Sequence, residues 1–248
     1  MEQGPRWVRI RRVTTASGSG SLSLGSVRVS LDLWALWADI AFEHEESARR
    51  ERRRLLTRFR DEPGYGYQPE TTNELEASII CVAAVGHSLD ALYGQVSQEL
   101  PRPSANVAPT PCSTSRRPKR ASHIREALKL RFATGRVDQQ RWVTEFEWLF
   151  SLRDAAVHPR WAIHHPVLHP SLIGFHVSPQ VVDYSAESAV RANELLLDVL
   201  QTCTTAFKPQ PAHEDARQWG QARHAGIAER IARTEASRDQ MPLAMQPG

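Results

Sequence analysis

Apolar positions recur at three- and four-residue steps in five segments of the chain, a spacing that places them on one face of an α-helix. We predict helices over residues 31–60, 71–96, 122–134, 138–158 and 185–207. The second segment has a broad apolar face and is expected at the centre of the fold. The pattern therefore predicts an all-α protein, a helical bundle of four to five main helices.

Local signals suggest where these helices begin and end. Thr71 and Glu74 have the spacing of a capping box, in which two side chains satisfy N–H groups of the first turn. Ser122 is expected to cap the third helix and Gly135 to end it. Pro159 is expected to end the fourth helix, because proline lacks an N–H group and disfavours helical geometry in the residue before it.

Several regions fall outside the helical pattern. Residues 1–30 hold two short alternating pieces around a Gly/Ser-rich stretch, which favours a flexible or hairpin flank. The helical domain is expected over residues 31–208, with a basic, proline-rich linker at 101–120 inside it. Within its last connection, residues 172–178 are expected to be extended. Residues 209–248 are rich in charge and alanine, which is typical of a solvated or partner-binding C-terminal helix.

Composition restricts the setting of the protein. With 248 residues, 41% hydrophobic and 24% charged, the chain can bury one core. Its longest nearly uncharged apolar run, residues 77–86, is far shorter than the roughly 20 residues of a membrane span. The charged N-terminus lacks the apolar block of a secretory signal. Three cysteines lie far apart, and Cys81 and Cys203 fall on apolar helical positions. We therefore expect a reduced, cytoplasmic protein that does not insert into a membrane.

The end of the fourth predicted helix carries the main candidate site. Its sequence "RDAAVH" places Arg153 five positions before His158 and Asp154 four positions before it. Residues four apart share a helix face, so the carboxylate can orient the imidazole and raise its basicity. The alternative is structural: His158 would interact with the carbonyl groups of the helix C-terminus, and Arg153 would pair with Glu147 or with a neighbouring helix.

As a catalytic site, these side chains suit the cleavage of RNA. His158 would take the proton from a ribose 2′-OH, and Arg153 would neutralise the phosphate during the reaction. Asp154 would hold the imidazole. This chemistry requires no metal and no cofactor, and we expect neither.

The motif resembles the signature of the HEPN superfamily (higher eukaryotes and prokaryotes nucleotide-binding). That signature is an arginine, four to six residues and a histidine, often with Asn, Asp or His directly after the arginine; Arg153, Asp154 and His158 match it. The resemblance covers residues 70–207 loosely. It implies a metal-independent endoribonuclease, frequently a toxin or defence effector, whose composite site forms when two subunits bring their motifs together. Some members bind nucleotides or RNA without cutting them.

Two basic blocks point to a polyanionic partner. The first, residues 49–60, lies in a helix where nearby acids could balance it. The second, residues 101–136, holds nine basic residues against one acid, Glu126, a net charge of +8. Such a concentration attracts phosphate backbones without regard to sequence, and the alternative is a solvated surface. The expected nucleic-acid-binding residues are Arg116, Arg117, Lys119, Arg120, Arg125 and Lys129.

Two further patterns favour ordinary structure. Five histidines lie between residues 158 and 176, but prolines separate them in a connection without the rigid elements that a zinc site needs. That connection is expected to be solvent-exposed or to face a substrate. The stretch Gly86-His87-Ser88 sits inside an apolar helix and lacks the strand-turn-helix setting of a nucleophile elbow. His87 and Ser88 are therefore expected in the core or at an interface.

The sequence thus predicts a cytoplasmic, HEPN-like, all-α protein that cleaves RNA as a homodimer. An antitoxin or another protein is a further candidate partner. The alternative is a non-catalytic helical module that binds nucleic acid or a partner protein through its basic linker and C-terminal helix.

Overall fold

The computed structural model confirms the all-α prediction. It describes residues 8–12, 27–31, 33–62, 69–99, 120–132, 136–157, 165–169, 172, 174–205, 228–229, 231–232 and 236. The elements in order are β1 (Val8–Arg12), β2 (Val27–Leu31), α1 (Leu33–Asp61), α2 (Pro69–Glu99), α3 (Arg120–Arg131), α4 (Arg136–Val157), β3 (Val167–Leu168), β4 (His176–Val177), α5 (Pro179–Asp183) and α6 (Ala186–Thr205).

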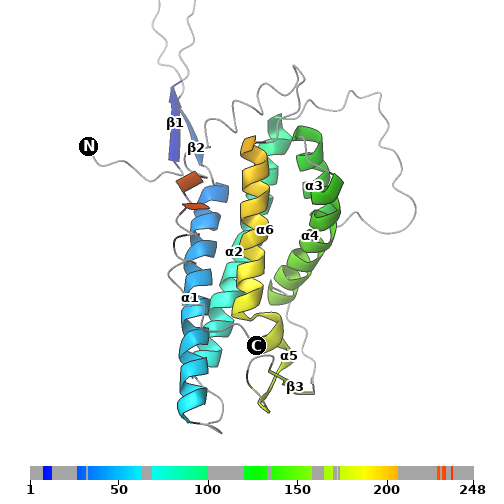
Figure 1. Ribbon diagram of the computed structural model, residues 1–248. Coiled ribbons are helices and arrows are strands. Elements are labelled where there is room, and N and C mark those ends of the chain that lie inside the picture. Colours follow the sequence, from blue (N-terminus) through cyan, green and yellow to red (C-terminus); the bar gives the residue numbers. More distant parts are fainter. Residues whose placement is uncertain are drawn as a thin grey trace, which may run out of the picture.

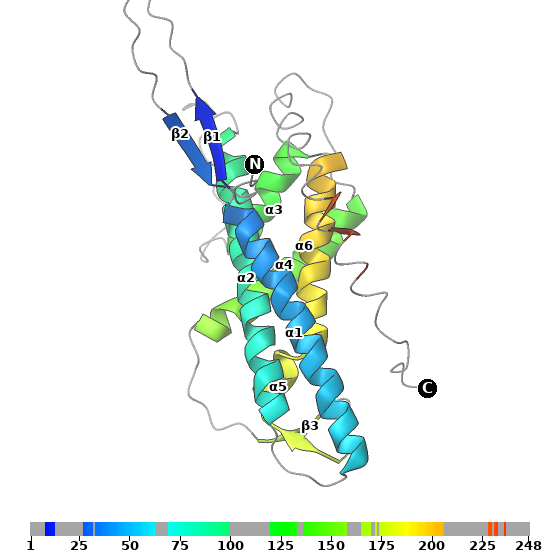
Figure 2. The ribbon, with the colours of Figure 1, turned by 90° about the vertical axis from the view of Figure 1, so that its left-hand side faces the viewer.

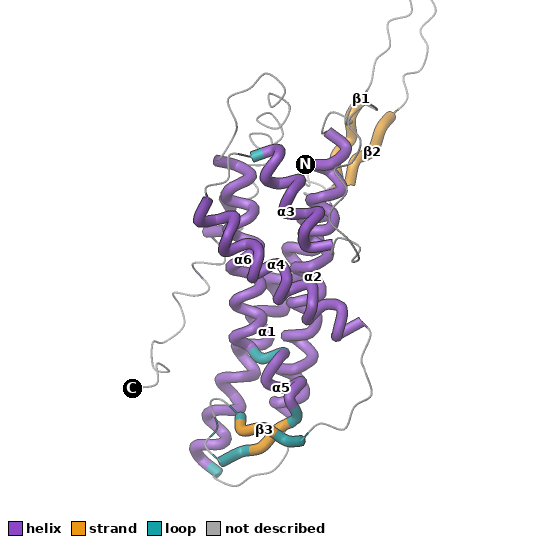
Figure 3. The backbone as a smooth tube through the Cα atoms, turned by 90° about the vertical axis from the view of Figure 1, so that its right-hand side faces the viewer, coloured by secondary structure: helices purple, strands orange, loops and turns teal. Residues whose placement is uncertain are grey.

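The helix α2 is central, because it contacts α1, α3, α4 and α6. Figure 1 shows α1, α2 and α6 running side by side, with α3 and α4 along the other side of α2. Figure 2, turned by 90° from Figure 1, shows α1 packed beside α2 along much of its length. Two antiparallel strand pairs, β1–β2 and β3–β4, lie at opposite ends of the bundle (Figure 3). The β1–β2 pair corresponds to the hairpin, one of the two alternatives predicted for residues 1–30.

Small side chains allow the long helices to approach one another. The buried apolar residues of α1 are mostly alanines, and α6 buries alanines together with leucines. The contact face of α4 is different, since it buries Trp142, Phe146, Leu149 and Phe150. Interaxial distance depends on the side chains at the contact, so these alanines favour a close approach of the helices.

Two predicted helix starts are wrong. α2 begins at Pro69, so Thr71 and Glu74 lie inside the helix and form no capping box. Proline fits a first helical turn, where its missing N–H group would have no partner in any case. α3 begins at Arg120, so Ser122 is not its cap, and Gly135 lies outside the described residues.

The C-terminal part of the bundle follows the prediction more closely. Ser185 precedes α6, and its Oγ accepts a hydrogen bond from the Ser188 backbone N–H at 3.4 Å. The expected extended piece corresponds in part to β4, which pairs with β3. The short helix α5, with a proline in its first turn, was not predicted. Cys81 and Cys203 are buried in the core as expected.

The central helix α2 is long and apolar. Its segment Glu70–Val96 is long and apolar enough to cross a membrane, whereas the nearly uncharged run at 77–86 is too short. More than half of its most apolar window is buried against the other helices. The central helix of a bundle meets the same criterion, so this is weak support for a membrane span.

A buried ionic cluster joins α1, α2, α6 and the β3–β4 segment. Arg52 is only 5% exposed, and its Nε lies 3.0 Å from Glu74 Oε1. Its Nη1 is 2.8 Å from His169 Nε2, and its Nη2 donates to Glu187 Oε2 at 2.6 Å. Glu74 Oε1 also accepts the backbone N–H of Ala186, the first residue of α6, at 2.8 Å. We call Arg52, Glu74, His169 and Glu187 the Arg52 cluster.

Within the Arg52 cluster, the pKa of Glu74 is raised and the pKa of His169 is lowered. Burial raises the pKa of Glu74 to about 7, although the charge of Arg52 and the Ala186 N–H act against this rise. Burial, together with the charge of Arg52, lowers the pKa of His169 to about 4. At neutral pH His169 is therefore uncharged, and its Nε2 can accept a hydrogen bond from Arg52.

We predict that the two groups give opposite pH dependences of stability. Glu74 stabilises the fold fully below its unfolded pKa of 4.5, and this contribution is lost as the pH rises towards 7. His169 stabilises fully above 6.5, and its contribution is lost as the pH falls towards 4. Glu74→Gln should therefore make stability rise more steeply with pH between these limits, and His169→Gln should make it rise less steeply.

Urea unfolding across this range measures both slopes, and one proton corresponds to about 1.4 kcal/mol per pH unit. Thr72→Ser, at an exposed position of α2, serves as a control that should leave the slope unchanged. Parallel curves for both variants and the wild type would contradict the prediction.

Candidate functional site

Arg153 occupies the position in α4 where the next core residue would stand. It lies three residues after the buried Phe150 and four after the buried Leu149, so it continues the same face of the helix. Its side chain is 17% exposed, and its guanidinium carbon lies 4.6 Å from the centre of the Phe150 ring. The aliphatic part of Arg153 is thus packed in the bundle while its charged end reaches the edge.

A glycine in α2 makes room for this arginine. A Cβ atom built on Gly86 would lie 2.7 Å from Cδ of Arg153, closer than real Cβ atoms come to a neighbour, and 3.3 Å from its Cγ, a tight contact. A glycine inside a helix costs roughly 1 kcal/mol relative to alanine. The close approach of Arg153 is the physical reason for a glycine at this position.

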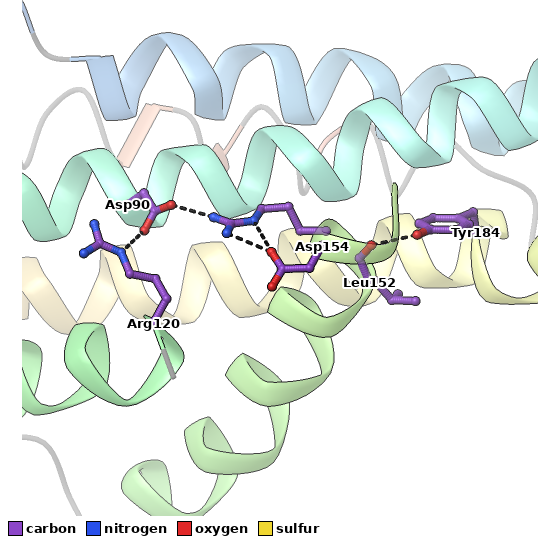
Figure 4. Close-up of polar contacts among 6 residues, drawn as sticks. Asp90, Arg120, Leu152, Asp154 and Tyr184 are labelled. Carbon is purple, nitrogen blue, oxygen red and sulfur yellow. Dashed lines mark hydrogen bonds and ion pairs between the residues drawn. The ribbon is translucent and has the colours of Figure 1, made fainter. Parts of the chain in front are cut away.

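Asp90, one turn after Gly86, fixes the guanidinium. Its Oδ2 accepts a hydrogen bond from Arg153 Nη1 at 2.6 Å, and its Oδ1 accepts one from Arg120 Nε at 2.6 Å. Asp154 Oδ1 accepts from Arg153 Nε at 3.2 Å and Nη2 at 2.9 Å. Figure 4 shows Asp90 on α2 beside Arg120 of α3 and Asp154 of α4. Two arginines and two aspartates therefore alternate across three helices.

The array leaves Arg153 able to bind a further group. A guanidinium has five N–H donors. Three of those on Arg153 bond Asp90 or Asp154. The other two have no hydrogen-bond partner within the described part of the chain. An oxyanion at the edge of the bundle could accept both of them in the fork geometry that arginine offers to phosphate.

The end of α4 is held by a tyrosine from the next part of the chain. Tyr184, between α5 and α6, donates its hydroxyl to the carbonyl oxygen of Leu152 at 2.7 Å (Figure 4). Burial raises the pKa of Tyr184, with a further contribution from Asp183, so the hydroxyl stays protonated and remains a donor. This bond fixes the backbone next to Arg153.

His158 lies outside the described residues, one position beyond the end of α4 at Val157. The hydrogen bond expected between Asp154 and its imidazole therefore stays a prediction. The partner of Asp154 in the described part of the chain is Arg153. Of the structural alternatives for Arg153, the contact with a neighbouring helix is the one observed, through Asp90 rather than Glu147.

Half of the predicted nucleic-acid-binding residues can be located. Arg120, Arg125 and Lys129 lie on α3, whereas Arg116, Arg117 and Lys119 fall outside the described residues. Arg120 is 44% exposed and lies over the Tyr93 ring at 4.4 Å. Part of the predicted charge is balanced, because Arg120 pairs with Asp90 and Glu126 pairs with Arg125 and Lys129 at 3.5 and 3.8 Å.

The other candidate residues are the histidines of the connection after α4, together with His87 and Ser88. His169 is buried in the Arg52 cluster, and His165 and His176 are exposed. No group of residues in the described part of the chain is arranged to hold a metal ion. The rings of His87 and Trp37 lie 4.8 Å apart, and Ser88 donates its hydroxyl to the Trp34 carbonyl oxygen at 2.8 Å. The prediction that His87 and Ser88 belong to the core or an interface agrees with these contacts.

Comparison of the chain with family models, curated proteins and solved structures gave no match. The resemblance to the HEPN superfamily therefore depends on the motif itself. Function has to be inferred from the residues and their geometry.

Sequence reasoning missed two members of the site, Gly86 and Asp90. Both interrupt an otherwise apolar stretch of α2, and they stand four positions apart, hence on one face. A glycine and an aspartate on one face of a central helix are a signal that another helix approaches there with a cation. The sequence did not indicate that this cation is Arg153.

We predict a strong coupling between Gly86 and Arg153. Gly86→Ala alone should destabilise the protein or displace Arg153, because the new methyl group meets its Cδ. In the Arg153→Ala background, Gly86→Ala should stabilise the protein by about 1 kcal/mol, because only the higher helix propensity of alanine then acts. A double-mutant cycle from urea unfolding measures this coupling. Gly94→Ala, where an added Cβ meets nothing within 4 Å, is the matched control. An additive cycle would contradict the contact.

Proposed function

We propose that this protein is a metal-independent endoribonuclease of the HEPN type. The observation that supports this best is the position of Arg153, which Gly86 and Asp90 hold near the end of α4 and which keeps two N–H donors without a partner among the described residues. His158, five positions further along the chain, is the proposed acid–base. Cleavage by the ribose 2′-OH requires at least a histidine that transfers a proton and, next to it, a hydrogen-bond donor that is held in place and binds the phosphate.

The proposed reaction is an internal transfer. His158 removes the proton from the 2′-OH, and the resulting 2′-oxygen attacks the adjacent phosphorus. The bond between phosphorus and the 5′-oxygen breaks, a second acid protonates that oxygen, and the products are a 2′,3′-cyclic phosphate and a 5′-OH. Arg153 stabilises the charge that develops on the non-bridging oxygens. General acid–base groups contribute about 10²- to 10⁴-fold in rate.

The two carboxylates have different roles in this proposal. Asp90 is 24% exposed and also pairs with Arg120, so it stays in place as the anchor of Arg153. Asp154 is 65% exposed, and a carboxylate at that exposure can rotate into solvent at little cost. Asp154 would then turn to the imidazole of His158, and an incoming phosphate would accept hydrogen bonds from the two N–H groups of Arg153 that have no partner within the described residues.

A homodimer completes the proposal. Cleavage needs both a base and an acid, and one motif supplies one histidine. Two copies that bring their α4 ends together would supply the second histidine and a second arginine. An antitoxin or another protein that covers this surface would block the site.

A non-catalytic helical module is the second candidate, and one observation favours it. Asp90 and Asp154 together neutralise Arg153 in the resting protein, as in a structural ion pair between helices. In that case the protein would bind nucleic acid or a partner through its basic segments, and Arg153 would only hold α4 to α2.

We predict that the purified protein cleaves RNA in the presence of EDTA and that Arg153→Ala and His158→Ala each abolish visible cleavage. Asp154→Asn should lose less, because an amide still accepts a hydrogen bond from the imidazole. Asp90→Asn should also reduce the rate, through weaker positioning of Arg153. Denaturing gels of labelled RNA measure these rates, and thermal melting of each variant shows whether the fold persists.

Arg191→Gln serves as the matched control, since it removes an exposed arginine that pairs with Glu145 on the α4–α6 face. It should cleave at the wild-type rate. If the wild type leaves RNA intact while Arg153→Ala melts several degrees lower, Arg153 is a structural ion-pair residue and the second candidate is correct.

A further inference from the structure

A second cluster of arginines lies on the outer side of α1. Its residues recur at steps of three and four, so they form one stripe along the helix. The stripe lines a hollow of about 600 Å³ between the end of α1 and the start of α2, which Asp61, Glu62 and Glu70 complete. We call the hollow, together with the stripe of residues that lines it, the arginine groove. The stripe consists of Arg50, Arg53, Arg54, Thr57 and Arg58.

The neighbouring arginines of α1 face the other way. Arg52 is buried in the Arg52 cluster, and Arg49, 19% exposed, pairs with the buried Glu45 at 3.4 Å. The basic block therefore divides into an inner set that pairs with Glu45, Glu74 and Glu187 and an outer set that lines the groove and pairs in part with Glu51 and Glu70. Sequence alone had left open whether acids balance the whole block.

Two largely buried carboxylates, those of Glu51 and Glu70, pair with arginines of the outer set and orient them. Glu51 is 7% exposed; it pairs with Arg54 Nη1 at 2.7 Å and lies 3.6 Å from Arg50 Nε. Glu70, 16% exposed, pairs with Arg58 at 2.6 Å. The guanidinium groups lie above these acids, with Arg50 49% and Arg54 61% exposed. Such anchoring limits the conformational entropy that a ligand would otherwise have to remove.

The charge of the groove is uneven along its length. Asp61 and Glu62 are exposed at the end next to the loop after α1, where they repel anions. Arg50, Arg53 and Arg54 occupy the other end, and Arg53 has no ion pair within the described part of the chain. An anion would therefore bind at the Arg50–Arg54 end, where exposed guanidinium N–H groups match phosphate oxygens in pairs.

We propose that the arginine groove binds the phosphate backbone of RNA without regard to base sequence. This inference rests on the proposed function for the identity of the ligand as RNA. Figure 1 places the end of α1 and the helix α3 at opposite ends of the bundle. α1 is 29 residues long, which corresponds to about 43 Å. RNA that contacts both α3 and the groove would have to run along the bundle.

The test uses the full chain carrying His158→Ala, so that any cleavage is removed and binding is read separately. Fluorescence anisotropy of a labelled single-stranded RNA over a salt series gives affinity and salt slope. The groove variant combines Arg50→Gln, Arg53→Gln and Arg54→Gln. It should weaken binding about tenfold and reduce the slope by about 2, since each lost phosphate contact contributes roughly 0.7 on single strands.

Two controls separate charge from folding. Arg50→Lys, Arg53→Lys and Arg54→Lys together keep the charge and should keep most of the salt slope. Arg141→Gln with Arg191→Gln removes two exposed arginines from the α4–α6 face and should leave affinity unchanged. Melting temperatures confirm that each variant folds. Labelled polyglutamate, tested in parallel, should bind far more weakly than RNA.

Three results would overturn the inference. The groove variant could bind RNA with unchanged affinity and slope, the protein could bind polyglutamate as well as RNA, or it could fail to bind RNA. The proposed function fails separately, when the wild type does not cleave RNA. A protein that cleaves RNA but binds it equally well without the groove arginines keeps the proposed function and loses this inference.

Discussion

The central position of α2 is the constraint on which the rest of the structure depends. This helix contacts four others, so a carboxylate on one of its buried or half-buried faces needs a partner on a neighbouring helix to offset the loss of its hydration. Glu74 is paired with Arg52 of α1, Ser88 with a carbonyl oxygen of α1, and Asp90 with arginines of α3 and α4. The ionic cluster and the candidate site are both consequences of placing carboxylates on this helix.

The same constraint gives the site its form. Asp90 draws Arg153 towards α2, and Gly86 allows the arginine to lie against the helix instead of standing away from it. The guanidinium is thus positioned before any ligand arrives, which is the arrangement that lowers the cost of stabilising charge in a transition state. Asp90 and the exposed carboxylate of Asp154 also balance its positive charge.

The helices could be predicted from the sequence because their apolar periodicity is local. What failed was the reading of polar residues whose partners are distant. Glu74 was interpreted through Thr71, three positions away, but its contacts are Arg52 and the first residue of α6. Asp90 and Arg153 are 63 positions apart, and nothing local joins them. One signal was available: Glu45, Ala48, Arg52 and Leu55 recur at alternating steps of three and four, which marks Glu45 and Arg52 as inward-facing.

In the reaction that we propose, Arg153 and His158 make the 2′-OH of RNA the nucleophile. The identity of the new ends tests this directly, since it depends on which oxygen attacks. Mass spectrometry of a short RNA incubated with the protein in EDTA should show a 2′,3′-cyclic phosphate on one product and a 5′-OH on the other. RNA ending in a 3′-OH beside a 5′-phosphate would mean that water attacks, and would contradict the account.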